Sequence, residues 1–136
     1  MKIFLIDTDI SVYYLKGLNG LREKFSKVKA ENIFISEITL AELKFGAENS
    51  VKIKENLQTI DKFVSTIQIL PIFNCIDFYA KEKARLKKSG QIIDDFDLLI
   101  GCSSVVNKLV LVTNNEKHFS RISNIKIENW IDKLIK

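Results

Sequence analysis

Three carboxylates at distant points of the chain have the residue type and placement needed to hold a divalent cation. Asp7 directly follows the apolar run 3–6, which predicts a buried strand. Ligands of α/β folds bind just outside the carboxyl ends of the strands. Glu42 and Asp97 fall at positions that ordinary surface charge explains poorly. Because oxygen-only ligands suit Mg²⁺ or Mn²⁺, these three acids predict a metal site.

Glu42 is informative because of the helix predicted over residues 37–48. At 3.6 residues per turn, Glu42 points away from the charged side of this helix and lies between two apolar stripes. The stripes are formed by Ile38, Ala41 and Phe45 and by Leu40, Leu43 and Ala47. A carboxylate held there is costly unless a metal ion or a hydrogen-bond donor satisfies it. The alternative is a buried ion pair with Lys or Arg, which is disfavoured because stability requires few such pairs.

Structural roles compete with chemistry at the start of the chain. An aspartate at a strand end often bonds the following backbone in a turn, and the position of Asp7 suits this role and a functional one equally. Asp9 opens the helix predicted over 9–16, directly before Ile10-Ser11-Val12-Tyr13, and suits its N-cap. Support of the metal through another ligand is the alternative role for Asp9.

Asp97 also has two interpretations. Asp94 followed three residues later by Asp97 resembles a capping box, and acids in a first turn favour the helix macrodipole. On the helix predicted over 95–107, however, Asp97 shares a narrow face with Gly101 and Ser104. Small residues beside a carboxylate leave room for a hydrated ion or for a close backbone, so both roles stay open.

A polar run follows the strand predicted over 109–112. Thr113 and Asn115 in this run are candidates for orienting a metal-bound water or a phosphate. The alternative is a turn in which Asn115 is the N-cap of a helix over 116–121. His118 is the only histidine, so a zinc site of His and Cys ligands is not expected, and we assign His118 no general-base role.

Strand and helix patterns alternate along the chain and must position these residues. Strands are predicted over 3–6, 33–35, 67–70, 109–112 and 125–127. Helices are predicted over 9–16, 20–28, 37–48, 51–65, 75–88, 95–107 and 116–121. This alternation predicts a mostly parallel sheet covered by helices on both faces.

Composition narrows the class of protein. The 136 residues, 46% of them hydrophobic, suit one globular domain. No apolar run approaches the ~20 residues needed to cross a bilayer, and the N-terminus lacks a signal-peptide pattern. Cys75 and Cys102 show no CxxC spacing, which favours free thiols in a reducing cytoplasm. The net charge of +4 is compatible with a polyanionic partner, whose phosphates a basic rim would hold.

The order and spacing of these motifs resemble PIN-domain ribonucleases, in particular the VapC-type toxins of bacterial and archaeal toxin–antitoxin pairs. The resemblance covers nearly the whole chain and implies a single PIN domain over residues 1–136, with a three-layer α/β/α fold and a central, mostly parallel five-stranded sheet. The motifs are Ile6-Asp7-Thr8-Asp9, Ile35-Ser36-Glu37-Ile38-Thr39-Leu40-Ala41-Glu42-Leu43-Lys44-Phe45-Gly46-Ala47, Asp95-Phe96-Asp97-Leu98-Leu99-Ile100-Gly101, Leu111-Val112-Thr113-Asn114-Asn115-Glu116-Lys117-His118-Phe119 and Glu128-Asn129-Trp130.

By this resemblance, Asp7, Glu42 and Asp97 match the metal-binding acids of the family. Asn115 falls where many members carry a fourth acid, and this weakens the case for a second tightly bound ion. His118 stands where an Asp or Glu often precedes the Phe, so a further acidic contribution is missing.

The resemblance also implies a function. The expected protein is a cytoplasmic, Mg²⁺- or Mn²⁺-dependent endoribonuclease that cleaves specific cellular RNA, such as tRNA or ribosomal RNA, through a metal-activated water. The expected assembly is a homodimer inhibited by a cognate VapB-type antitoxin whose tail covers the cleft. Contact with DNA is expected only through the antitoxin, and no membrane partner is expected.

Two other functions compete with this expectation. An RNA- or partner-binding PIN module that has lost catalysis is left open by the missing fourth acid, although all three other acids are present. Asp7-Thr8-Asp9 also resembles the nucleophile motif of haloacid-dehalogenase-type phosphatases, in which Asp7 would be phosphorylated. Against a phosphatase, Asp94 and Asp95 open a helix before the last long strand instead of following it, and Glu42 has no role.

Overall fold

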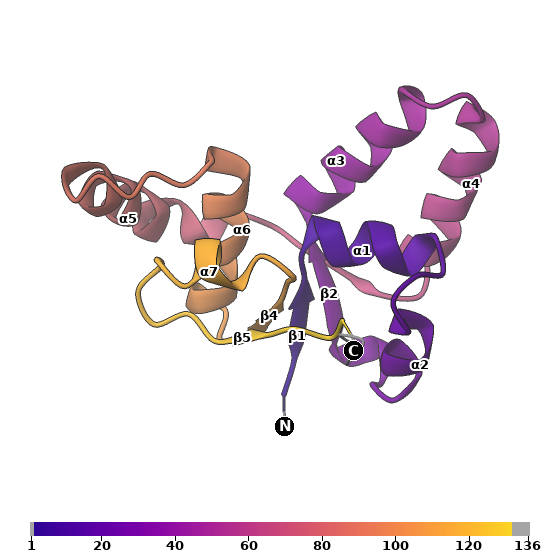
Figure 1. Ribbon diagram of the computed structural model, residues 1–136, viewed down its shortest axis with the longest axis horizontal. Helices are drawn as coiled ribbons and strands as arrows, with labels where there is room; N and C mark the ends of the chain where they lie inside the picture. The colour runs from indigo at the N-terminus through magenta and orange to yellow at the C-terminus, as the bar shows by residue number, and fades with distance from the viewer. Residues whose placement is uncertain (1, 132–136) are drawn as a thin grey trace, which may run out of the picture.

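A central strand, β1 (Phe4–Ile6), organises a five-stranded sheet in the computed structural model, which describes residues 2–131 (Figure 1). The strand order is β3-β2-β1-β4-β5, and every pair of neighbouring strands is parallel. The other strands are β2 (Ile33–Ser36), β3 (Gln68–Leu70), β4 (Val110–Val112) and β5 (Ile127–Glu128). The sheet is thus entirely parallel, where the sequence indicated a mostly parallel one.

The helices lie where the periodicity of the sequence placed them, with ends that differ from the predicted ones by no more than two residues. They are α1 (Thr8–Leu15), α2 (Leu21–Ser26), α3 (Glu37–Glu48), α4 (Ile53–Val64), α5 (Ile76–Lys88), α6 (Asp95–Val106) and α7 (Glu116–Phe119). Two short 3₁₀ helices, η1 (Ala30–Asn32) and η2 (Phe73–Cys75), were not predicted.

Alternation of side chains along β1 builds two separate cores. Phe4 and Ile6 pack on one face of the sheet with apolar residues of α1 to α4, whereas Leu5 packs on the other face with residues of α5 to α7. Successive residues of a strand point to opposite faces, so a strand buried on both sides is a continuous apolar run. The result is the expected three-layer α/β/α arrangement, with the two groups of helices on opposite sides of the sheet (Figure 1).

One expectation about α3 was wrong. The stripe formed by Ile38, Ala41 and Phe45 is not buried, since Ala41 is exposed and 69% of Phe45 is accessible. The other stripe is covered, and Leu43 and Ala47 are buried. The reason is tertiary: α3 packs most extensively on α4 and extends past the sheet (Figure 1), while on its other side Ile38 is partly buried in the core that contains α6 and Ala41 and Phe45 stay in solvent.

Both cysteines are buried free thiols, as expected. Burial raises the pKa of Cys102 to about 12 and also raises the pKa of Cys75. Neither thiol is therefore activated as a nucleophile at neutral pH. Within residues 2–131, no helix has both the length and the apolar character that crossing a membrane requires.

An ion pair between buried Glu82 and exposed Arg85 on α5 also bonds the segment that follows α7. Glu82 is buried and accepts hydrogen bonds from Nε and Nη2 of Arg85 at 3.0 and 2.9 Å, and from the backbone N–H of Ser123 at 2.8 Å. Arg85 Nη2 also donates to the carbonyl of Arg121 at 2.8 Å. The guanidinium of Arg85 holds the pKa of Glu82 at about 2, far below its ordinary 4.5.

Replacing Glu82 with Gln should therefore remove a pH-dependent part of the stability. Because the pKa is lowered in the folded state, the contribution is complete above the ordinary 4.5 and is lost as the pH falls towards 2. Wild type should exceed E82Q in free energy of unfolding by about 1–2 kcal/mol at pH 7, because exposure of Arg85 to solvent screens the pair, and by a smaller amount at pH 3. Urea unfolding followed by circular dichroism measures both differences.

The matched control is Glu31→Gln, an exposed glutamate for which the described part of the chain records no ion pair. It should change the unfolding free energy by less than about 0.5 kcal/mol at either pH. An E82Q protein whose deficit is equal at pH 7 and pH 3 would show that the Glu82–Arg85 pair does not carry the difference.

Candidate active site

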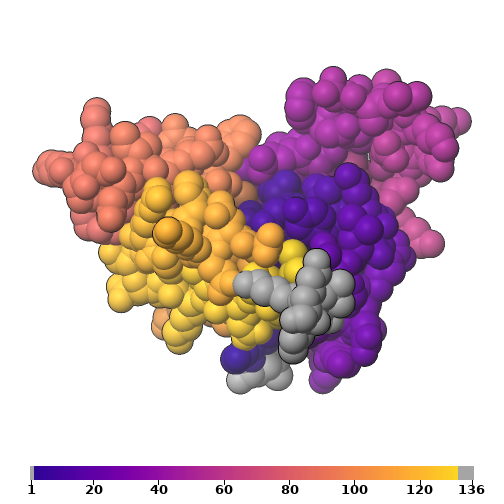
Figure 2. Space-filling model, in the orientation of Figure 1, coloured from indigo at the N-terminus to yellow at the C-terminus, as the bar shows by residue number. Residues whose placement is uncertain are grey.

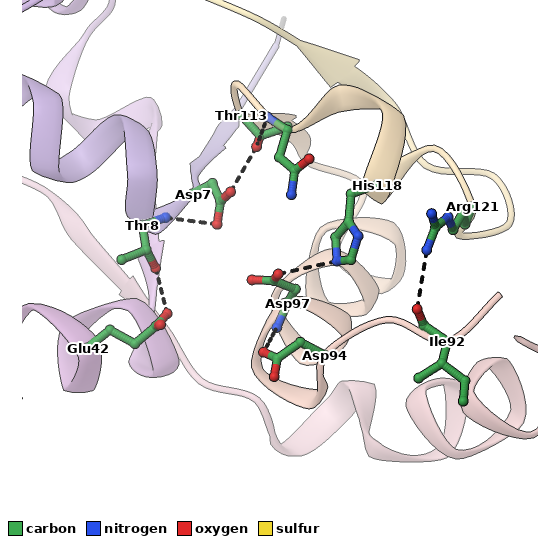
Figure 3. A network of polar contacts seen from close by, with 10 residues as sticks. Asp7, Thr8, Glu42, Ile92, Asp94, Asp97, Thr113, His118 and Arg121 are labelled. Carbon is green, nitrogen blue, oxygen red and sulfur yellow. Dashed lines mark hydrogen bonds and ion pairs between the residues drawn. The ribbon is translucent and has the colours of Figure 1, made fainter. Parts of the chain in front are cut away.

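The candidate site lies at the carboxyl ends of β1 and β4. The chain proceeds from β1 outward to β3 and then returns to the other side of β1, so β1 and β4 flank the point where the strand order reverses. Ligands of open α/β sheets bind in the crevice at such a point. Figure 2 shows a hollow between the segment of α3 and α4 and the segment of α5 and α6. The three predicted acids face this region from α3, from α6 and from the end of β1 (Figure 3).

Asp7 is held rigidly at the base of the site. Its carboxylate accepts hydrogen bonds from the backbone N–H of Thr8 and from the hydroxyl of Thr113, each at 2.8 Å (Figure 3). Only 4% of Asp7 is accessible, and Thr113 is fully buried. Thr113 also accepts from the backbone N–H of Asn115 at 3.0 Å. Since the one hydroxyl proton of Thr113 is used on Asp7, Thr113 positions Asp7 instead of pointing at a water or phosphate.

The prediction that Asp9 caps α1 was wrong, because the cap is Asp7. Asp7 has extended backbone angles, and its side chain accepts from the first N–H of the helix. The helix thus begins one residue earlier than predicted and includes Asp9 in its first turn. There Asp9 accepts from the backbone N–H of Asn114 at 3.2 Å, which ties α1 to the loop after β4.

Glu42 is satisfied by a hydroxyl and is partly exposed. Its Oε1 accepts from Oγ1 of Thr8 at 2.7 Å, and Oγ1 of Thr8 lies 3.0 Å from Oγ1 of Thr39. Because Thr8 has one hydroxyl proton and directs it at Glu42, Thr39 must donate to Thr8. The described residues record no Lys or Arg partner for Glu42, so the donor foreseen from the sequence is neutral and the carboxylate keeps its charge uncompensated.

The backbone of Asp97 takes part in the cap of α6, while its side chain faces the cleft. Its backbone N–H lies 3.5 Å from the carboxylate of Asp94, which caps α6. The side chain of Asp97 takes no part in that cap and faces the cleft, where its Oδ2 is 3.3 Å from Nε2 of His118 (Figure 3). Capping is thus performed by Asp94, and the carboxylate of Asp97 is left for chemistry.

Burial disfavours the ionised forms of the aspartates in the site. Desolvation, followed by repulsion from Asp9, raises the pKa of Asp7 to about 8. Burial also raises the pKa of Asp97 and of Asp9, although His118 opposes the shift of Asp97. A bound cation relieves the repulsion between these carboxylates, and carboxylate oxygens are ligands that suit Mg²⁺ or Mn²⁺. Among residues 2–131 no three acidic, His or Cys side chains lie close enough to hold one ion, so ligation requires side-chain rotation.

Asn115 is joined to the site through its backbone N–H, which bonds Thr113, and the described residues record no hydrogen bond of its side chain. It precedes α7 as its N-cap residue, but its side chain makes no capping bond, and it is exposed at the rim. The residues missed from the sequence are Thr8 and Thr39: Thr8 bonds Asp7 through its backbone N–H and Glu42 through its hydroxyl, and the hydroxyl of Thr39 contacts that of Thr8. A signal was present, since Thr39 lies one helical turn before Glu42 and on the same face of the helix.

The fold and site define a class, an α/β domain with an acidic cleft at the reversal of a parallel sheet. The sequence pattern of the PIN domain matches residues 4–125, and the chain belongs to the PIN-domain family. The chain is 36% identical to ribonuclease VapC2 of Rickettsia felis, over 94% of this chain and 98% of that protein. It is 32% identical to the tRNA(fMet)-specific endonuclease VapC of Salmonella typhimurium, over 93% of this chain and 97% of that protein.

Solved structures agree with the sequence relatives. The chain superposes on a chain of the DNA-bound VapBC complex of Salmonella typhimurium with a TM-score of 0.89 and 32% identity, covering 96% of this chain and 99% of that one. The promoter-DNA-bound VapBC2 complex of Rickettsia felis gives a TM-score of 0.86 and 35% identity, covering 94% and 98%. The expected PIN-like α/β/α fold and the resemblance to VapC-type toxins are confirmed. Because the chain belongs to the PIN-domain family, the haloacid-dehalogenase-type phosphatase is excluded.

Asp7→Asn should stabilise the metal-free protein. The raised pKa means that Asp7 favours unfolding progressively as the pH rises from about 4 to about 8, since only the unfolded state ionises freely over that range. Removing the acid should raise the free energy of unfolding in EDTA by about 1–2 kcal/mol at pH 8 and by less at pH 5. Thermal or urea unfolding in EDTA measures the gain.

The exposed residue Asp77 offers the control for this prediction. Asp77→Asn should change stability by less than about 0.5 kcal/mol at both pH values. A destabilised Asp7→Asn protein would mean that the bonds from Thr8 and Thr113 outweigh the unfavourable burial of charge.

Proposed function

We propose that this PIN domain is a divalent-metal-dependent endoribonuclease toxin that hydrolyses phosphodiester bonds of cellular RNA. The observation that carries the proposal is the buried carboxylate of Asp7, whose pKa is raised to about 8 and which shares a cleft with Glu42 and Asp97 (Figure 3). Raised carboxyl pKa values in a cleft mark functional sites, because such groups weaken a fold unless a ligand compensates them. The ribonuclease names of the relatives support the same chemistry.

The residues of the chain divide the work. Asp7, Glu42 and Asp97 would hold Mg²⁺ or Mn²⁺, which when bound neutralises phosphate charge and lowers the pKa of a coordinated water. Thr113 and the backbone of Thr8 keep Asp7 in one orientation at the base of the cleft. The hydroxyl of Thr8 aims Glu42 at the same region from α3. Asn115 at the rim is placed to contact the RNA.

We further propose tRNA as the substrate class, with ribosomal RNA as the alternative. One relative, 32% identical over almost its full length, is named for cleavage of tRNA(fMet). The wall of the cleft formed by α5 and α6 carries exposed cations that can hold the phosphates of a folded RNA, in keeping with the net charge of +4. The cations on α5 are Lys81, Lys87 and Lys88, together with Lys83, which is paired with Asp95, and Arg85, which is paired with Glu82.

The proposed partner is a VapB-type antitoxin, as in the VapBC complexes of the structural relatives. A groove of about 370 Å³ runs between α1, α3 and α4, and its lining includes Leu15, Leu43, Ile60 and the site residue Glu42. A tail seated there would cover Glu42 and inhibit cleavage. Promoter DNA would be contacted only through the antitoxin, and the reaction would take place in the cytoplasm.

A homodimer completes the proposal. Large apolar side chains are exposed on α3, η2, α5 and α6, and a second copy of the chain is the partner that we propose to cover them. These side chains are Phe45, Phe73, Ile76 and Phe96.

Purified protein with Mn²⁺ or Mg²⁺ should remove one or a few discrete RNAs from total cellular RNA. EDTA should abolish the cleavage, and Asp7→Asn should lower its rate by at least about 1000-fold, because the base of the metal site is lost. Sequencing of the fragment ends identifies the substrate. Transcripts of tRNA(fMet) and of an elongator tRNA then test the proposed tRNA class directly.

Asp7→Asn is a strong control because it is expected to be more stable than wild type, so loss of cleavage cannot reflect unfolding. Mn²⁺ should also raise the melting midpoint of wild type and raise that of Asp97→Asn much less. RNA binding without cleavage by wild type, at any metal concentration, would favour the catalytically inactive PIN module instead.

Thr8→Val tests the hydroxyl that aims Glu42. Valine keeps the shape of the side chain but removes the donor at 2.7 Å, so Glu42 turns freely and kcat should fall by about tenfold or more. Thr8→Ser retains the hydroxyl and should restore most of the activity. Steady-state cleavage of the identified RNA by the three proteins gives the comparison, and equal rates for Val and Ser would exclude a positioning role for this hydroxyl.

A further inference from the structure

The side chain of His118 is placed in the acidic cleft by close packing of α6 against the segment that follows it. A Cβ at Gly101 would lie 2.3 Å from Cδ1 of Ile122 and 3.2 Å from Cδ1 of Phe119, so the absence of a side chain lets α6 approach α7 closely. His118 neighbours Phe119 and consequently faces Asp97, which lies one turn before Gly101 on α6 (Figure 3).

Nε2 of His118 lacks a proper hydrogen-bond partner. The atom is buried from solvent, and within residues 2–131 no hydrogen bond satisfies it. Its contact with Oδ2 of Asp97, at 3.3 Å, is an ion pair only when the imidazole is protonated. A buried polar nitrogen without a partner is unfavourable, and when the neutral imidazole carries its proton on Nδ1 the lone pair of Nε2 faces the lone pairs of the Asp97 carboxylate. A cation between the two atoms removes both penalties.

The spacing of the two atoms suits a shared ion. Adjacent ligands of an octahedral cation bound at about 2.1 Å lie about 3.0 Å apart. The observed separation of 3.3 Å between Nε2 of His118 and Oδ2 of Asp97 is therefore close to that of two neighbouring ligands.

We propose that Nε2 of His118 is a nitrogen ligand of the metal ion beside Asp97, and that this nitrogen makes the site prefer Mn²⁺ to Mg²⁺. The proposal rests on the metal site of the proposed function and names a ligand of that site. Mg²⁺ takes oxygen ligands almost exclusively, whereas imidazole binds transition metals well. Three carboxylates alone would not discriminate the two ions in this way.

The composition of the chain makes the test unambiguous. His118 is the only histidine, so any imidazole signal from a bound metal must come from it once a purification tag has been removed. Electron spin-echo envelope modulation of the Mn²⁺ complex of the wild-type protein should show coupling to a ¹⁴N imidazole nitrogen. The signal should be absent from His118→Glu, which offers an oxygen in place of the nitrogen.

Calorimetric titration with Mn²⁺ and Mg²⁺ supplies the second readout. His118→Glu should lower the ratio of Mn²⁺ affinity to Mg²⁺ affinity by about tenfold or more, because the nitrogen that favours Mn²⁺ is replaced by an oxygen that Mg²⁺ accepts well. Lys117→Gln, an exposed neighbour on α7, is the matched control and should leave both affinities within about twofold.

The outcomes separate this inference from the proposed function. Mn²⁺ that binds without nitrogen coupling, in a protein that still cleaves RNA, would overturn the role of His118 and leave the ribonuclease intact. Failure of wild type to bind Mn²⁺ at all would overturn the metal site itself. Equal loss of both ions in His118→Glu, again without nitrogen coupling in wild type, would show that His118 acts only as the charge partner of Asp97.

Discussion

The hydrogen bond between Asp7 and Thr113 is the interaction on which the site depends. It joins the residue after β1 to the residue after β4, across the point where the strand order reverses. Both residues are buried, so the carboxylate has one orientation and little access to water. Neither bonding partner carries a positive charge. The bonds therefore fix the position of Asp7 but do not offset the effect of burial, and the pKa of Asp7 stays raised.

The cleft is lined by residues from both faces of the sheet. Glu42 comes from α3, which packs with the helices on one face of the sheet, and Asp97 comes from α6 on the other face. Asp7 lies between them at the end of the central strand. Opposed walls with a rigid base are suited to a long, charged substrate such as RNA, since each wall can contact phosphates while the acids stay at the centre.

The acids of this site are held by hydroxyl groups of threonines, whereas buried Glu82 is held by an arginine. Glu82 is paired with Arg85, and its pKa is lowered to about 2, which makes that pair a stabilising contact. Asp7 and Glu42 receive bonds from threonines, so no cationic side chain among these partners compensates them and their oxygens stay available to a cation. An acidic side chain with a cationic partner thus stabilises this fold, whereas one with only neutral partners remains able to bind a ligand.

Much of this protein was determined by the sequence itself. Local periodicity is a property of neighbouring residues, so the order of strands and helices, the parallel sheet and the three acids could be predicted. Tertiary structure alone decided the exposure of Phe45, the bond between Asp7 and Thr113, and the contact of His118 with Asp97. Each depends on which element packs against which, because the side chains that meet are far apart in the sequence, 21 residues for Asp97 with His118 and 106 for Asp7 with Thr113. Spacing within one helix or strand carries no information about such contacts.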